Sequence, residues 1–522
     1  MSDSRTRRSI KNIKVATIFY IVNLILQFFS RKIFLDYLGG EILGLNTTAQ
    51  NLLGFLNIAE LGIGTAVAYN LYKPLYNNNR KSVCEIISIQ GWLYKRIAIV
   101  VIVGAVIMMA FFPLIFAKAD VPLWYAYGTF CVLLLGAMLG YFVNYKLIIL
   151  SADQKQYKIT YIAQSIKIIK IIFQILVVRY FSNGYVWWMV LEAVAALFTA
   201  YALSKCVKHE YPWLKTDIAS GGQLRKVYPN VIGKTRQVFF HKISGFVLTQ
   251  TTPLVIYGFA SLTMVAIYGN YLIIVTAVIM LMESLLNGIG AGVGNLVAEG
   301  NKQQIKKVFW EITSIRIWLA LIFCFLFYIM GDSFIALWVG EEYILPKAPF
   351  ILILFTAFIR MTRTNDIFIS AYGLYQDVWA PIAEAVLNIG LSILLGYYYG
   401  LTGILSGVLI SLLVIVCVWK PYFLYNKGFH ESVKEYVVRY GKLILLVLIS
   451  WFIARFIVNS TINDVNTYWQ WIWKGAIVFI LISVVSFCLF YLAEKNFRSL
   501  IFRVLQYFKS IMRNAIKQTN EI

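Results

Sequence analysis

Residues 97–117 read IAIVVIVGAVIMMAFFPLIFA, a run without a single charged side chain. Lys95 and Arg96 precede the run, and Lys118 follows it directly. About 20 mostly apolar residues are enough for a helix to cross the hydrocarbon core of a bilayer. The stretch therefore predicts a membrane-spanning helix. Comparable stretches predict fourteen spans in all, near residues 15–37, 42–70, 97–117, 122–149, 159–180, 185–204, 232–257, 263–290, 317–338, 348–371, 379–399, 403–425, 443–459 and 469–492.

The composition of the whole chain agrees with this interpretation. Of its 522 residues, 60% are hydrophobic and 14% are charged, whereas soluble domains carry about 25% charged residues. The loops between the predicted spans are short, which leaves no room for a soluble domain. The sequence thus predicts an all-α polytopic membrane protein. It excludes a cytosolic enzyme, a disordered chain and a nucleic-acid-binding protein, in spite of a net charge of +23.

The distribution of basic residues predicts the orientation. Lys and Arg are retained on the cytoplasmic side of membrane proteins. With the N-terminus inside, the cytoplasmic segments hold 33 basic residues and the external segments hold 3. Both termini are therefore expected in the cytoplasm, and the first apolar run is expected to be an uncleaved helix. The six cysteines are scattered without metal-ligand spacing, so neither a metal site nor a cofactor is expected.

An internal repeat divides the chain. Ser151-Ala152, Tyr180 and Gly184 recur with identical spacing as Ser370-Ala371, Tyr399 and Gly403. The offset between the two sets corresponds to six spans, so two six-helix halves in parallel orientation are expected to enclose a central cavity. The predicted domains are an N-terminal bundle over 1–215, a C-terminal bundle over 216–436, two further helices over 437–493 and a tail over 494–522. In that tail, one helical face is apolar and the other basic, which favours a helix lying on anionic lipid; the two faces are Phe497, Leu500, Ile501, Val504, Phe508 and Ile511 against Arg498, Arg503, Lys509 and Arg513.

Polar residues share one face on five predicted spans. Ionisable groups in membrane helices are costly and usually face a cavity or a partner. Basic members outnumber acidic ones, which favours a cavity that attracts phosphate or carboxylate. The alternative is that the basic side chains extend to the interface and that the amides bond between helices; Glu60 in particular fits either a structural role or proton coupling. The candidate substrate-binding residues are Arg31, Lys167, Lys170, Lys234, Arg360 and Arg363, and the candidate cavity or coupling residues are Asn23, Gln27, Asn57, Glu60, Gln164, Gln174, His241 and Asp366.

Residues 31–75 carry a family resemblance. They read RKIFLDYLGGEILGLNTTAQNLLGFLNIAELGIGTAVAYNLYKPL. The residues that carry the resemblance are Arg31, Gly39, Gly44, the run 59–64 and the segment 72–75. The stretch resembles bacterial polysaccharide flippases of the Wzx type, in the multidrug/oligosaccharidyl-lipid/polysaccharide exporter superfamily. The resemblance implies a flippase, not an enzyme, that moves undecaprenyl-pyrophosphate-linked oligosaccharide across the bacterial inner membrane by alternating access. It also implies coupling to a proton or sodium gradient or to the membrane potential, and contact with other polysaccharide-assembly proteins.

Three other classes of function remain open on sequence. A membrane enzyme acting on lipid-linked glycans, such as a glycosyltransferase, polymerase or ligase, would need catalytic groups, commonly on a sizeable external loop. The external loops are short, and their acidic residues form no evident pair. A drug exporter of the same superfamily would need acidic faces for organic cations, and these faces are basic. A scaffold for assembly enzymes would not need intramembrane charges.

Overall fold

The computed structural model describes residues 5–60, 63–229, 231, 246, 250–374, 376–377, 379–461, 465–503 and 506. Most of these residues are helical, and they contain no strand. Ten of their helical segments are long and apolar enough to cross a membrane. The all-α membrane class is therefore confirmed, while the predicted number of fourteen spans is not.

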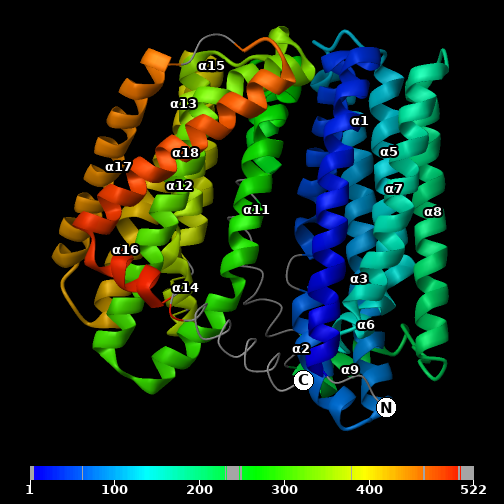
Figure 1. Ribbon diagram of the computed structural model, residues 1–522. Coiled ribbons are helices and arrows are strands. Elements are labelled where there is room, and N and C mark those ends of the chain that lie inside the picture. Colours follow the sequence, from blue (N-terminus) through cyan, green and yellow to red (C-terminus); the bar gives the residue numbers. More distant parts are fainter. Residues whose placement is uncertain are drawn as a thin grey trace, which may run out of the picture. The chain divides into compact units, whose positions relative to one another are not determined.

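The chain folds into two compact units. Unit 1 comprises residues 1–269 with 396–401, and unit 2 comprises residues 270–395 with 402–522. Each unit is a bundle of long helices (Figure 1).

Unit 1 begins with α1 (Arg5–Leu56), which packs along α7 (Gln156–Tyr180). Helix α7 packs in turn against α8 (Gly184–Glu210), and α8 against α5 (Leu123–Phe142). Beside them α3 (Arg80–Ala110) contacts α2 (Ile63–Tyr76) and α9 (Gly221–Val227). Apolar side chains from α2, α3, α5 and the short α6 (Ile148–Ala152) form the core of this unit. The remaining short elements are η1 (Asn57–Glu60), α4 (Phe112–Ile115) and η2 (Asn144–Leu147).

Unit 2 is built around α12 (Lys302–Val339), and most residues in the apolar part of this helix are buried. It packs against α13 (Lys347–Met361), α17 (Lys434–Thr461) and α18 (Tyr468–Ala493). Most of α11 (Leu262–Glu299), η3 (Glu341–Tyr343) and α14 (Thr364–Ala371) also belong to this unit. Its longest helical stretch runs from α15 (Trp379–Leu412) through η4 (Leu413–Trp419) and α16 (Lys420–Phe423) to η5 (Leu424–Phe429), and η4 and η5 are π-helical.

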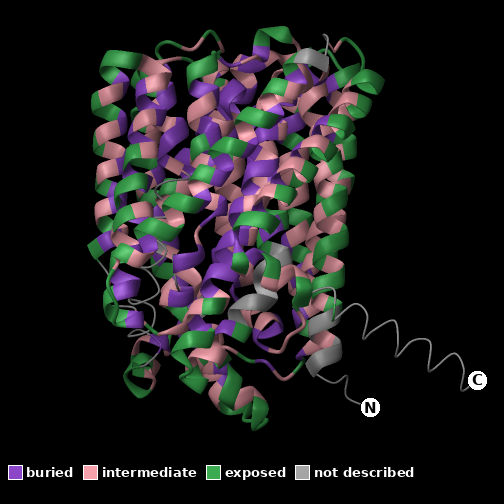
Figure 2. Cartoon of the chain, turned by 60° about the vertical axis from the view of Figure 1, so that its left-hand side comes forward, coloured by how far each residue is buried: buried purple, intermediate pink, exposed green. Residues whose placement is uncertain are grey.

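The outer faces of the helices are apolar. Leu445, Leu448, Phe452 and Phe456 of α17 are exposed at three- and four-residue spacing, which places them on one face. Figure 2 shows such exposed positions along the whole length of the helices, not only at their ends. In water this surface would be unfavourable, so these faces are suited to lipid.

Two glycines mark breaks inside the longest helices. Gly39 in α1 has φ +79° and ψ 171°, and Gly400 in α15 has φ +55° and ψ −135°. Both conformations are nearly restricted to glycine. The two breaks fall between predicted spans 15–37 and 42–70, and at the boundary of 379–399 and 403–425. The second predicted span is too long, because α1 ends at Leu56 and gives way to η1.

Two turns have the same local geometry at the offset of the predicted repeat. After α6, Gln154 has a positive φ and the Lys155 amide donates to the Leu150 carbonyl at 2.7 Å; after α14, Gly373 has a positive φ and the Leu374 amide donates to the Ile369 carbonyl at 3.0 Å. The two turns are separated by the same offset that the sequence shows. A second pair of turns matches in the same way, because Asn79 caps α3 and Asn301 caps α12, each preceded by a residue with positive φ.

The start of the C-terminal tail packs on protein. Phe497, assigned from sequence to a lipid-facing side, is fully buried, with ring contacts to Trp318 at 5.6 Å and to Phe490 at 5.6 Å. Arg503 binds the buried Glu311 carboxylate of α12 at 2.6 Å. The expectation that Phe497 faces lipid is therefore wrong, because α12 and α18 offer it an aromatic pocket. Val504, Phe508, Lys509, Ile511 and Arg513 lie outside the described residues.

Candidate functional site

Four of the predicted polar residues lie on α7 of unit 1. Gln164 accepts a hydrogen bond from Asn23 of α1 at 3.0 Å. Lys170 makes an ion pair with Glu192 of α8 at 2.6 Å, and Gln174 donates to the same carboxylate at 3.0 Å. Residues on α1, α7 and α8 are thus joined by polar contacts along apolar helices. Two of the predicted site residues, Lys170 and Gln174, serve to hold Glu192.

Lys167 differs from Lys170, although the two lie one turn apart. Its side chain is exposed, and it forms no ion pair with any carboxylate that the structure describes. At 1.5 Å per residue, Lys167 lies about 16 Å along the helix axis from the start of α7 and about 20 Å from its end. It is therefore a cation in the middle of an apolar helix.

Arg31 lies near the break in α1. Its Nη2 donates to the Ala266 carbonyl on α11 at 2.9 Å. A Cβ at Gly269 would lie 2.7 Å from this nitrogen, so the absence of a side chain there makes room for the guanidinium. Gln27, one turn before Arg31, is exposed.

Asn57 and Glu60 lie in η1, each bonded to a tyrosine. The Tyr141 hydroxyl donates to Asn57 Oδ1 at 2.8 Å, and the Tyr94 hydroxyl donates to Glu60 Oε1 at 2.8 Å. The two rings pack edge to face, 5.4 Å between centroids. Of the two roles predicted for Glu60, these contacts favour the structural one.

In unit 2, the predicted residues Arg363 and Asp366 contact each other. Arg363 Nε lies 2.6 Å from Asp366 Oδ2, and Lys420 of α16 lies 2.5 Å from Asp366 Oδ1. The sequence predicts one continuous span over 348–371, but the helix is interrupted at Thr362 and Arg363, between α13 and α14. Arg360 lies in the last turn of α13, so its expected alignment with Arg363 and Asp366 on one helical face is wrong.

Three charged residues on these helices and on α15 were not found from sequence. Glu192 pairs with Lys170, Lys420 pairs with Asp366, and Glu384 of α15 is 1% exposed. Within the described part of the chain, Glu384 Oε1 has no hydrogen-bond partner. Glu192 was detectable in principle as an acidic residue in the span that follows two lysines. The predicted residues Lys234 and His241 lie outside the described residues.

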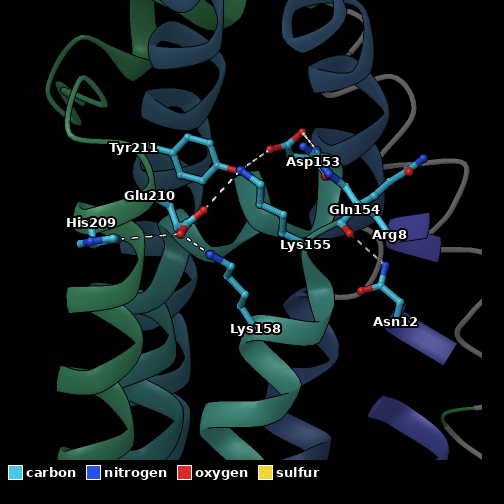
Figure 3. A network of polar contacts seen from close by, with 9 residues as sticks. All are labelled: Arg8, Asn12, Asp153, Gln154, Lys155, Lys158, His209, Glu210 and Tyr211. Atoms are coloured by element: carbon cyan, nitrogen blue, oxygen red, sulfur yellow. Dashed lines mark hydrogen bonds and ion pairs between the residues drawn. The ribbon is translucent and has the colours of Figure 1, made fainter. Parts of the chain in front are cut away.

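A network of polar contacts surrounds Asp153 in the turn between α6 and α7 (Figure 3). Its carboxylate binds Arg8 of α1 at 3.0 Å and Lys155 at 2.9 Å, and accepts a hydrogen bond from Tyr211 at 2.7 Å. Burial raises the pKa of Asp153, but the hydrogen bonds and positive charges outweigh it, so its pKa lies below the ordinary value of 3.8. Burial and this carboxylate raise the pKa of Tyr211.

The same network joins three helix ends. Lys155 and Lys158 bind Glu210 at the end of α8, and Asn12 of α1 donates to the Gln154 carbonyl at 3.0 Å. Figure 3 shows these side chains converging from α1, α7 and α8. The network ties together the ends of the helices whose middle parts carry Lys167, Lys170 and Glu192. Among the described residues, no group of three His, Cys, Asp or Glu side chains is placed to hold a metal ion.

Neither a protein-family model nor a curated protein matches this chain. Solved structures match it in fold. The lipid II flippase MurJ, in an inward closed conformation, is 15% identical and matches with a TM-score of 0.61 over 94% of this chain and 99% of its own. A multidrug resistance MATE family transporter of the MOP superfamily, in an inward-facing conformation, is 15% identical and matches with a TM-score of 0.57 over 78% of this chain and 96% of its own. The chain thus has the fold of these membrane transporters.

Proposed function

We propose, from this transporter fold, that the chain is a flippase for undecaprenyl-pyrophosphate-linked oligosaccharides. It moves them from the cytoplasmic to the outer leaflet of the bacterial inner membrane by alternating access, driven by a proton or sodium gradient or by the membrane potential. Its termini are proposed to be cytoplasmic. The sequence repeat proposes six-helix bundles over 1–215 and 216–436, whereas the compact units of the structure divide between residues 269 and 270.

The observation that carries this proposal is Lys167. An ammonium group at the middle of an apolar helix is costly in hydrocarbon, and among the described residues no carboxylate pairs with it. Reaching an interface from this depth is harder than from a helix end. A water-filled passage that admits an anion accounts for its position, and diphosphate is such an anion.

Two of the other basic residues predicted to bind substrate contact carboxylates. Lys170 and Arg363 each bind a carboxylate and hold neighbouring helices together. Arg31, Arg360, Lys167 and the undescribed Lys234 are the proposed ligands of the diphosphate. The amides of Asn23, Gln27 and Gln164 are proposed to bind sugar hydroxyls, since amides both donate and accept hydrogen bonds.

The fold supports transport without covalent chemistry. A charged, hydroxyl-rich headgroup cannot cross hydrocarbon unaided, because each unsatisfied polar group costs several kcal/mol there. MurJ, which matches 94% of this chain, is a flippase of a lipid. A lipid-linked substrate needs only its headgroup to pass through the protein, while its tail stays in the bilayer.

Reconstitution into liposomes tests the proposal. A fluorescent polyprenyl diphosphate glycan is placed in both leaflets, and the fraction open to an impermeant quencher is followed with and without imposed proton, sodium and voltage gradients. We expect protein-dependent movement that one of these gradients accelerates. Sugar transfer to another acceptor in the same preparation would instead identify an enzyme.

Export of organic cations is a second candidate function, favoured by Glu384. This carboxyl is 1% exposed and has an oxygen that no described group satisfies, and a buried acidic group suits a cation or its coupling proton. The same liposomes loaded with ethidium distinguish the two functions. Ethidium transport that Glu384→Gln abolishes, without glycan movement, would replace the flippase proposal.

A further inference from the structure

Two cavities meet at the last turns of α2 in unit 1. One, of about 490 Å³, is lined by Arg8, Tyr76 and the turn after α6; the other, of about 440 Å³, is lined by Tyr69, Asn70 and Tyr228. Tyr72 and Lys73 line both. We call the two cavities together the α2 groove. Its parts have the size of small-ligand sites, which are about 300–1,000 Å³.

The charge of the α2 groove favours an anion. The Asp153 carboxylate is held by Arg8, Lys155 and Tyr211, so it is already neutralised. Lys73 is exposed and, among the described residues, forms no ion pair. An ammonium at the meeting point of two cavities is suited to a phosphate oxygen.

Aromatic residues form one side of the groove. Tyr69, Tyr72 and Tyr76 are 57%, 54% and 70% exposed and follow helical spacing on α2. Their rings offer broad apolar surface with a hydroxyl at the edge, and the amides of Asn70 and Gln154 line the same cavities. Apolar ring faces beside amide groups are complementary to a sugar, which has both apolar faces and hydroxyls.

The internal repeat helps to decide whether the α2 tyrosines bind a sugar or only anchor the helix at the bilayer surface. Aromatic side chains anchor helices at the bilayer surface, and such anchoring would be needed equally in both halves. The match of the caps Asn79 and Asn301 aligns residues 64–81 with residues 286–303, which contain no aromatic residue and have Asn295 at the position of Lys73. The tyrosines and Lys73 are therefore specific to the first half.

We infer that the α2 groove binds the sugar-phosphate headgroup of the substrate at the predicted cytoplasmic face, before translocation. This inference rests on the proposed function and adds a separate loading site to it. The phosphate is bound by Lys73, and the adjoining sugar is bound by Tyr72 and the neighbouring amides. A phospholipid headgroup shares the phosphate but lacks the sugar.

Binding and transport by the full-length protein in phosphatidylcholine membranes test the inference. The probes are citronellyl diphosphate N-acetylglucosamine, citronellyl diphosphate without sugar, and phosphatidylglycerol. The variants are Tyr72→Ala and Lys73→Gln, and the matched controls are the exposed Tyr201→Ala on α8 and Lys81→Gln on α3. Thermal unfolding verifies that each variant is folded.

We expect Lys73→Gln to weaken binding of both diphosphate probes about tenfold, the loss of one charge-assisted hydrogen bond. Tyr72→Ala should weaken only the sugar-bearing probe. In the flipping assay both should raise the half-saturating substrate concentration and leave the maximal rate unchanged, while the controls match the parent protein.

Kinetic and binding results could each overturn the inference. One is an unchanged half-saturating concentration in both variants while the parent protein flips its substrate. The other is binding in which Lys73→Gln affects phosphatidylglycerol alone, or in which none of the probes binds. Absence of flipping by the parent protein would instead refute the proposed function, and the binding measurements would still decide whether the groove is a site.

Discussion

Lys167 and Lys170 show how two like residues on one helix acquire different roles. The ammonium of Lys170 lies 2.6 Å from Glu192, and Gln174 supports the same carboxylate. Lys167 has no such partner in the described residues. A partly buried charge pair holds two helices together, whereas an unpaired cation is available to a passing anion.

Because of this difference, substitution of Lys170 should affect stability, whereas substitution of Lys167 should affect transport. Lys170→Gln or Glu192→Gln leaves one charge uncompensated and should lower the free energy of unfolding by about 3 kcal/mol, with partial recovery in the double variant. Lys167→Gln should leave stability unchanged and reduce flipping. Thermal unfolding beside the flipping assay measures both. Equal destabilisation by Lys167→Gln and Lys170→Gln would show that Lys167 has a structural partner.

Asp153 gives a pH-dependent prediction. Its pKa in the folded protein lies below the ordinary 3.8, so the charged form is bound more strongly in the folded state and stabilises it at higher pH. Asp153→Asn should cost about 1–2 kcal/mol at pH 7, and the difference should disappear as the pH falls below about 4. Unfolding measured across this range provides the test.

The exposed loop residue Asp120, changed to Asn, is the control for Asp153. A deficit in Asp153→Asn that persists unchanged in acid would contradict the role of its charge.

For the helices, the sequence predicts the features that depend on neighbouring residues alone. Apolar runs identified the long helices, and the glycines at 39 and 400 lie at predicted boundaries. The break between α13 and α14 was missed, because residues 348–371 are apolar enough to be continuous. Asp366 beside that break binds Lys420, which lies far along the sequence on α16. Such pairings depend on which helices become neighbours. The residue pattern of a single span does not identify its neighbouring helices.

Gly39 provides a prediction about an element. Its φ and ψ lie in a region almost restricted to glycine, and a Cβ there would meet nothing within 4 Å. Gly39→Ala should therefore cost about 1–3 kcal/mol from backbone strain alone. Gly140, helical in α5 and equally open, is the control, since Gly140→Ala should be neutral or stabilise by up to about 1 kcal/mol. Thermal unfolding compares them, and equal effects would argue against strain at residue 39.

Over the whole chain, segments that match in sequence also match in the geometry of their turns. The turns after α6 and α14 make the same hydrogen bonds at equivalent positions of the two halves. The candidate site was predicted less completely. The sequence indicated which helices carry charge, but not that Glu192, Lys420 and Asp366 take part in ion pairs that neutralise some of it. Lys167 stands outside these ion pairs in the described part of the chain, and the proposed function depends on it.

The most direct test of this account is the initial flipping rate of a polyprenyl diphosphate glycan in liposomes, measured for the parent protein and for Lys167→Gln. Lys118→Gln, at an exposed residue in the turn after α4, serves as the charge-matched control. We expect rapid flipping by the parent and the control, and a rate at least about tenfold lower for Lys167→Gln. Equal rates for all three, or no flipping above protein-free liposomes, would contradict it.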